Sequence, residues 1–144
     1  MPSRIVSFFH PSVVESPLSV QTSFSAAVRH EHDLRAGATP GVSGQRFRER
    51  LEGIRVRISA VGSPAATTIT VQVSLDPGGD DIVVPATDAT VATGITTSTK
   101  GAVAYSVKLP IYQSAAGEVG KLYVHLKSNH PCTVDQTTLT WTET

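Results

Sequence analysis

The sequence predicts an all-β protein, an antiparallel β-sandwich or barrel that follows an extended N-terminal arm. Three observations support this prediction. Apolar and polar residues alternate in several short stretches after Gly53. Turn-forming residues separate these stretches at intervals of about 8–15 residues, as in sandwiches and barrels. Neither a convincing amphipathic helix nor the strand–helix–strand spacing of a parallel sheet is visible.

The first strands are marked by clear alternation. Apolar residues take every second position in residues 54–58 and again in 69–75. A turn follows at residues 76–81, because its proline ends the ladder and its glycines can adopt positive φ. Residues 82–84 form a short strand that Pro85 stops, which indicates a strand at the edge of a sheet.

The same period of two continues to the end of the chain. It predicts strands at residues 103–109, 122–126 and 139–141. Fifteen of the 17 threonines follow residue 58, and β-branched residues favour half-exposed sheet surfaces. The one helical candidate is residues 43–52, where Phe47 and Leu51 are spaced for one or two turns at most.

The first third of the chain has a different character. Residues 1–45 carry X-Pro steps and glycines that favour extended or turning backbone. They are too rich in apolar residues to remain unpacked in solvent. These residues run either as strands on the domain or as an arm across a neighbouring subunit. We expect a docking segment over residues 1–52 and a β-sandwich domain over residues 53–144.

Composition and charge restrict the class of protein. The chain has 144 residues and zero net charge, so general attraction to nucleic acid or to an anionic membrane is not expected. No apolar run approaches the roughly 20 residues of a membrane span, and the N-terminus lacks the pattern of a signal peptide. All eight arginines lie in residues 1–57, whereas all four lysines follow residue 58. Because arginine suits desolvated contacts, this asymmetry indicates contacts in the first third. Compositional drift in a high-GC genome is the alternative.

Two sets of possible metal ligands stand out. His30 and His32 point the same way in an extended strand, so both can reach one ion. No third ligand stands at a fixed spacing from them, and a solvated or salt-bridged segment is the alternative that we favour. Four aspartates offer oxygen ligands for calcium, but turn formation explains the Asp-Pro-Gly-Gly-Asp-Asp sequence without an ion. These aspartates are Asp76, Asp80, Asp81 and Asp88. We expect neither a metal nor a cofactor.

Catalytic motifs are weak. Cys132 forms a Cys–His dyad only if the fold brings it to His125 or His130, and a buried thiol is the ordinary alternative. Residues 117–121 resemble a phosphate-binding loop superficially. The motif requires a glycine where Ala115 stands and a serine or threonine where Leu122 follows the lysine, so it is not satisfied. No nucleophile elbow is present. We therefore expect that the chain is not an enzyme.

Aromatic residues and arginines of the first third are the candidate partner-binding residues. Phenylalanines anchor many interfaces, and the arginine cluster at residues 46–50 suits an acidic protein surface better than nucleic acid, because only Phe47 is interleaved with it. Packing within the same subunit and internal salt bridges are the alternatives. The candidates are Phe8, Phe9, Phe24, Arg29, Arg35, Arg46, Arg48 and Arg50.

Three blocks of the sequence carry a resemblance to a known family. They are residues 69–75 with the following turn, residues 94–107, and residues 121–127 with the terminal Leu139-Thr140-Trp141. The stretch from Ile54 to Trp141 resembles small virion proteins of tailed bacteriophages, namely decoration (cement) and head or tail accessory proteins. The resemblance implies a jelly-roll-like sandwich, a homo-oligomer (trimer or dimer) on the particle, and no catalysis.

What the resemblance implies for function is a structural protein made in the host cytoplasm and located in the virion. A capsid decoration protein would bind the major capsid protein or other virion subunits and stabilise the shell, with no role for membranes. A head–tail or tail accessory protein is the first alternative. A carbohydrate-binding or adhesin module is the second, since an exposed tyrosine can stack on a sugar ring.

Overall fold

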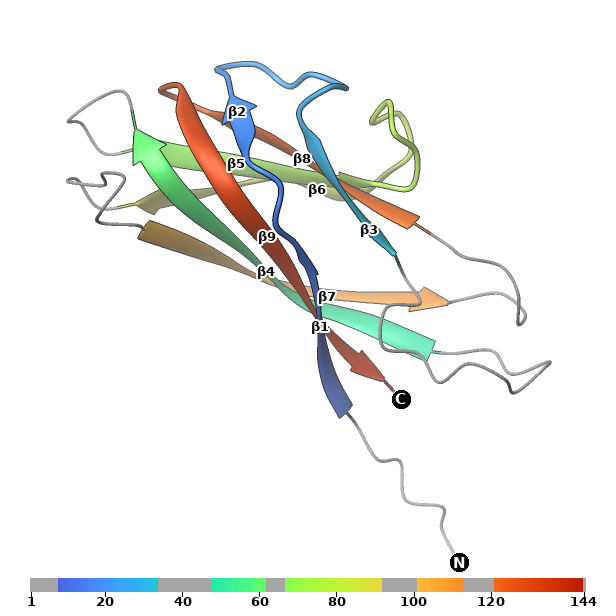
Figure 1. The fold of residues 1–144 in the computed structure, drawn as a ribbon. Coiled ribbons are helices and arrows are strands. Elements are labelled where there is room, and N and C mark those ends of the chain that lie inside the picture. Colours follow the sequence, from blue (N-terminus) through green and yellow to red (C-terminus); the bar gives the residue numbers. More distant parts are fainter. Residues whose placement is uncertain (1–7, 34–47, 62–66, 92–100, 113–120, 144) are drawn as a thin grey trace, which may run out of the picture.

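The computed structural model describes residues 8–33, 48–61, 67–91, 101–112 and 121–143. These residues form nine β-strands and, among them, no helix (Figure 1). The all-β prediction is confirmed. The strands are β1 Phe8–Val14, β2 Leu18–Val20, β3 Arg29–Asp33, β4 Arg48–Val61, β5 Thr67–Ser74, β6 Ile82–Val91, β7 Gly101–Tyr112, β8 Lys121–Ser128 and β9 Cys132–Glu143.

The strands form two antiparallel sheets that pack face to face (Figure 1). One sheet has the order β1-β9-β4-β7, with β2 also paired to β9, and the other has the order β3-β8-β5-β6. The pairing is nested, because β5 pairs β6, β4 pairs β7, β3 pairs β8 and β1 pairs β9. Counting β1 and β2 as one interrupted strand, this is the two-sheet, eight-strand arrangement of a jelly roll.

Prolines within the described strands all lie at sheet edges. Pro11 is in β1, Pro85 is in β6 and Pro110 is in β7, and each of these strands ends the order of its sheet. Proline has no N–H to donate to a ladder, so an edge position costs it no hydrogen bond. The predicted edge position of the strand that Pro85 was expected to stop is confirmed, although β6 continues past this residue.

The core lies between the two sheets, as the alternation of the sequence requires. Its largest members are fully buried, and Tyr105 of β7 adds a hydrogen bond across the sandwich, since its hydroxyl donates to the Ile69 carbonyl of β5 at 2.6 Å. This bond joins the two sheets on the side of β7 and β6. Buried core residues include Leu51, Ile54, Ile58, Ile69, Leu122, Leu126, Leu139 and Trp141.

The turn between β5 and β6 is held by one aspartate. The Asp76 carboxylate accepts hydrogen bonds from the backbone N–H groups of Asp80 at 3.0 Å and Asp81 at 2.6 Å. These bonds lower the pKa of Asp76. Gly79 has a φ of 81°, the left-handed conformation that side chains with a Cβ rarely adopt. The turn predicted from Asp, Pro and Gly is confirmed, and its chemistry accounts for Asp76 without an ion.

The described parts of residues 1–52 belong to the two sheets. Residues 8–14 and 18–20 pair with β9, and residues 29–33 pair with β8, so the chain there adds strands and is not an arm beside the sandwich. The expected boundary at residue 52/53 falls inside β4, whose residues pair with β9 from Glu49 onward. The helical turn considered at 43–52 is wrong for residues 48–52, which are strand.

Candidate functional site

Four of the candidate partner-binding residues meet at one end of the five-stranded sheet. Phe8 and Phe9 open β1, and Arg48 and Arg50 open β4. The end of β9 lies between these strands, so Thr142 pairs with Phe9 on one side and with Arg50 on the other. The start of β1 and the end of β9 lie side by side in Figure 1. We call this region, Phe8–Phe9, Arg48–Arg50 and Thr142–Glu143, the docking end.

Two more candidates lie on the outer face of the four-stranded sheet. The Arg29 guanidinium lies over the Tyr123 ring, 5.6 Å from its centre, and the Lys127 ammonium lies 5.0 Å from the centre of the Phe24 ring. Tyr123 and Lys127 alternate along β8 with core residues and are half-buried. Arg29 also donates to the Ala26 carbonyl. We call these two pairs the cation–aromatic face. Arg35 and Arg46 lie outside the described residues.

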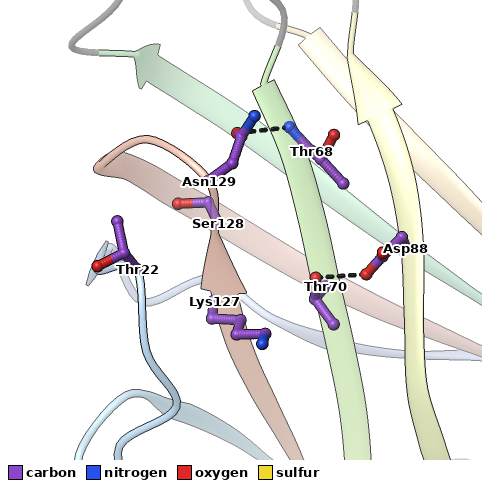
Figure 2. A pocket seen from close by; sticks show the side chains of 7 residues that line it. All are labelled: Thr22, Thr68, Thr70, Asp88, Lys127, Ser128 and Asn129. Carbon is purple, nitrogen blue, oxygen red and sulfur yellow. Dashed lines mark hydrogen bonds between the residues drawn. The ribbon is translucent and has the colours of Figure 1, made fainter.

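A polar cavity of about 190 Å³ opens beside Lys127 on the same outer face. Figure 2 shows that its lining comes from β5, β6, the end of β8 and the segment after β2. The Thr70 hydroxyl donates to one carboxylate oxygen of Asp88 at 2.5 Å, and the Thr68 backbone N–H donates to the Asn129 side-chain oxygen at 2.8 Å. The lining residues are Thr22, Thr68, Thr70, Asp88, Lys127, Ser128 and Asn129.

This cavity was not predicted from the sequence. Asp88 was considered only as a possible calcium ligand, and the threonines only as residues that favour β-sheets. The cavity residues come from four separate segments and form no local motif. The strand register brings them together, since Thr70 pairs with Asp88 in β6 and with Lys127 in β8. No local pattern in the sequence reveals which residues of these three strands lie side by side.

The two histidines of β3 point the same way, as predicted, but into the interior. His30 is 2% exposed and His32 is 1% exposed. Nε2 of His30 lies 2.5 Å from the Ser16 carbonyl, and its Nδ1 accepts a hydrogen bond from the Thr137 hydroxyl of β9. Nδ1 of His32 lies 3.0 Å from the Ser12 hydroxyl of β1. We call this group the histidine clasp, because it connects the two sheets.

Burial sets the charge state of the clasp. It lowers the pKa of His30, and together with repulsion from His30 it lowers the pKa of His32 to about 4. Both rings are therefore neutral near pH 7. Nε2 of His32 is buried and has no hydrogen-bond partner among the described residues. Within the described ranges no group of three or more His, Cys, Asp or Glu residues is placed to hold a metal ion. The pair is better described as a structural contact.

Cys132 is buried at the start of β9. Its thiol lies 3.6 Å from the Ser128 hydroxyl, and burial raises the pKa of the thiol, the opposite of what activates a nucleophile. His125, one of the two histidines considered as its base, instead contacts the Ser74 hydroxyl at 2.8 Å through Nε2. The arrangement fits a small buried side chain.

Comparisons with known proteins give a likeness of fold to solved structures. No family model matches the sequence, and no curated protein matches it. The fold is similar to a chain in a cryo-EM structure of a virus-like particle of extra small virus, from the giant freshwater prawn Macrobrachium rosenbergii. The two are 7% identical with a TM-score of 0.41, over 99% of this chain and 82% of that chain. A likeness at this level assigns neither a family nor a function.

No helix that is long and apolar enough to cross a membrane occurs within the part of the chain that the structure describes.

Proposed function

We propose that this chain is a structural, non-enzymatic subunit of a virion that binds other protein subunits of the particle. The observation that carries the proposal is the docking end. The Phe8–Phe9 pair and the arginines at 48 and 50 are far apart in sequence, and they occupy the two strands that flank the end of β9. Phenylalanine and arginine are both enriched in protein interfaces.

The fold supports the same proposal. Jelly rolls build viral capsids as well as lectins and enzymes, so the fold admits this function without assigning it. The sandwich is also linked on both sides, by Tyr105 on one and by the histidine clasp on the other. A scaffold linked in this way holds the backbone of the docking end in regular strands, which are more precise than loops as a base for a binding site.

In its finer form, the subunit is a decoration (cement) protein that binds the major capsid protein as a dimer or trimer. Symmetry repeats each contact many times over a shell, so individually weak contacts add up to tight attachment. The protein would be made in the host cytoplasm and incorporated into the virion. A head–tail or tail accessory protein would use the same docking end on a different subunit.

The test is attachment of purified variants to particles that lack this protein. A deletion of the first third would remove β1, β2 and β3 from the sheets, so point variants are the cleaner choice. We expect Phe9→Ala combined with Arg50→Ala to reduce co-sedimentation with the particles by about tenfold or more, the scale of interface anchors. Arg55→Ala is the matched control, because Arg55 is an exposed arginine further along the same strand.

Each outcome is decisive for the docking end. Full attachment of the double variant would exclude it as the contact surface, and equal loss in the Arg55 variant would show a general charge effect instead. Thermal unfolding of all three proteins distinguishes lost contact from lost fold. Failure of the unaltered protein to bind any particle subunit would overturn the virion role itself.

A further inference from the structure

The polar cavity on the outer face of the four-stranded sheet has a lining that selects one class of ligand. All seven lining residues are polar, and they combine one carboxylate and one ammonium group with hydroxyl and amide groups. Asp88 can accept hydrogen bonds, and Lys127 can only donate them. The Thr22 hydroxyl can do both, whereas the Thr70 hydroxyl donates its proton to Asp88 and the Thr68 hydroxyl is bonded to that of Thr90. A ligand that fits this lining must itself carry both donors and acceptors.

Other ligand classes fit the lining poorly. An apolar ligand would desolvate these polar groups without returning their hydrogen bonds. A small anion would meet the Asp88 carboxylate, whose Oδ1 is bonded to Thr70. A divalent cation would find a single carboxylate together with the Lys127 ammonium, whereas calcium takes six to eight oxygen ligands.

Phe24 supplies a flat apolar surface next to this lining. The Lys127 ammonium lies 5.0 Å from the centre of the Phe24 ring, so the lysine is oriented by the aromatic face while it lines the cavity. Phe24 is half-buried. Sugars present hydroxyl groups on their edges and C–H groups on their faces, which matches polar groups beside an aromatic ring.

The volume points to a compact ligand. About 190 Å³ is smaller than the roughly 300–1,000 Å³ of sites that enclose drug-sized molecules. We propose that this cavity is a saccharide-binding site that holds one sugar ring, with Asp88 accepting from its hydroxyls, Lys127 and the Thr22 hydroxyl donating, and Phe24 flanking it. The site lies on a different sheet from the docking end, so it does not rest on the proposed virion role.

The experiment is a screen of the full chain against a panel of neutral monosaccharides and short oligosaccharides by saturation-transfer NMR, followed by titration of each hit. The variants are Asp88→Asn, which keeps the shape of the side chain, and Lys127→Met, which keeps its length. We expect each to weaken binding by about tenfold or more, since hydrogen bonds to charged groups are the strong ones. Gln72→Ala is the matched control, because Gln72 follows Thr70 by two residues in β5 but does not line the cavity.

Three outcomes would overturn the proposal: no binding to any sugar of the panel at millimolar concentration, binding that survives both cavity variants, or equal competition by inorganic sulfate. Circular dichroism of each variant shows whether the fold is intact, and Thr22→Val provides a second cavity variant outside the regular strands. Particle attachment of the Asp88 variant keeps the two functions apart. Loss of sugar binding with unchanged attachment is the expected pattern.

Discussion

Nδ1 of His32 in β3 lies 3.0 Å from the hydroxyl of Ser12 in β1, and this contact joins the two sheets of the sandwich. Ser12 is 4% exposed, whereas its neighbour Val13 is 47% exposed. The polar residue of this pair therefore faces the interior and the apolar one faces solvent. This is the reverse of the usual arrangement, and His32 explains it, because a buried ring nitrogen needs a hydrogen-bonding partner.

The histidine clasp makes stability sensitive to acid. Burial lowers the pKa of His32 to about 4, below the value of roughly 6.5 in an unfolded chain. The contribution of neutral His32 to the free energy of unfolding is complete above pH 6.5. It is lost as the pH falls towards 4, because the histidine binds a proton more tightly in the unfolded chain than in the folded protein. We expect the free energy of unfolding to fall by up to about 3 kcal/mol over this window, measured by urea unfolding.

A variant separates this effect from other acid effects. His32→Gln can still form a hydrogen bond with Ser12 but does not titrate, so its stability should change less between pH 6.5 and 4. The Asp76 carboxylate, whose pKa is lowered, loses its contribution only below about pH 4, outside this window. An unchanged slope in the glutamine variant would show that the acid sensitivity has another source.

The hydrogen bond between Tyr105 and Ile69 should have a measurable effect on stability. Tyr105→Phe leaves the Ile69 carbonyl without this donor in the core, and a lost buried hydrogen bond costs about 1–2 kcal/mol. Tyr123→Phe is the control on the outer face, where it removes only a hydrogen bond to the exposed Glu31 carboxylate and should cost no more than about 0.5 kcal/mol. Chemical denaturation of both variants checks the difference, and equal stability would contradict a role for this bond in joining the sheets.

Calcium should leave the turn between β5 and β6 unchanged. Both carboxylate oxygens of Asp76 are bonded to backbone N–H groups, so a cation would have to compete with these bonds. We expect the same melting temperature with added calcium and with a chelator. Asp76→Ala should speed hydrogen exchange at the amides of Asp80 and Asp81, and Asp80→Ala should not. A calcium-dependent rise in melting temperature would revive the metal alternative.

Cys132 should react slowly in the folded protein. It is 6% exposed and burial raises the pKa of its thiol, so little thiolate meets the reagent. We expect alkylation by iodoacetamide to be slow at pH 8 and to become fast in urea. Rapid modification of the native protein would indicate that the start of β9 opens readily.

The strands that the sequence predicted correctly are those with apolar residues on one face. Ile54, Ile69 and Leu122 each begin such an alternation. It is needed because one face of each strand packs in the hydrophobic core. β3 could not be found in this way, because its residues Arg29–Asp33 are all polar and its inward positions hold histidines. The spacing of His30 and His32 was the available signal. It favoured a solvated or salt-bridged segment over a metal site, and that preference is wrong because both rings are buried against Ser12 and Thr137, which are distant in sequence.

The candidate sites were predictable only in part. Phe24 and Arg29 were expected to contact a partner or their own subunit, and the structure shows both in cation–aromatic pairs within the chain. Their partners Tyr123 and Lys127 are about a hundred residues away, so only the three-dimensional structure shows which ring meets which cation. The same limit applies to the cavity, whose residues share a surface because of strand register and not because of any local pattern.

The nested pairing also sets the order in which the strands find their partners available during synthesis. β5 and β6 adjoin in the chain and can pair as soon as both have emerged from the ribosome, whereas β1 and β2 must wait for β9, which is the last of the nine strands to be made. Until then β1 and β2 have no partner in their own sheet among the described strands. Pairing from the middle of the chain outward is therefore open to the nascent chain, whereas the pairing of β1 and β2 has to follow the synthesis of β9.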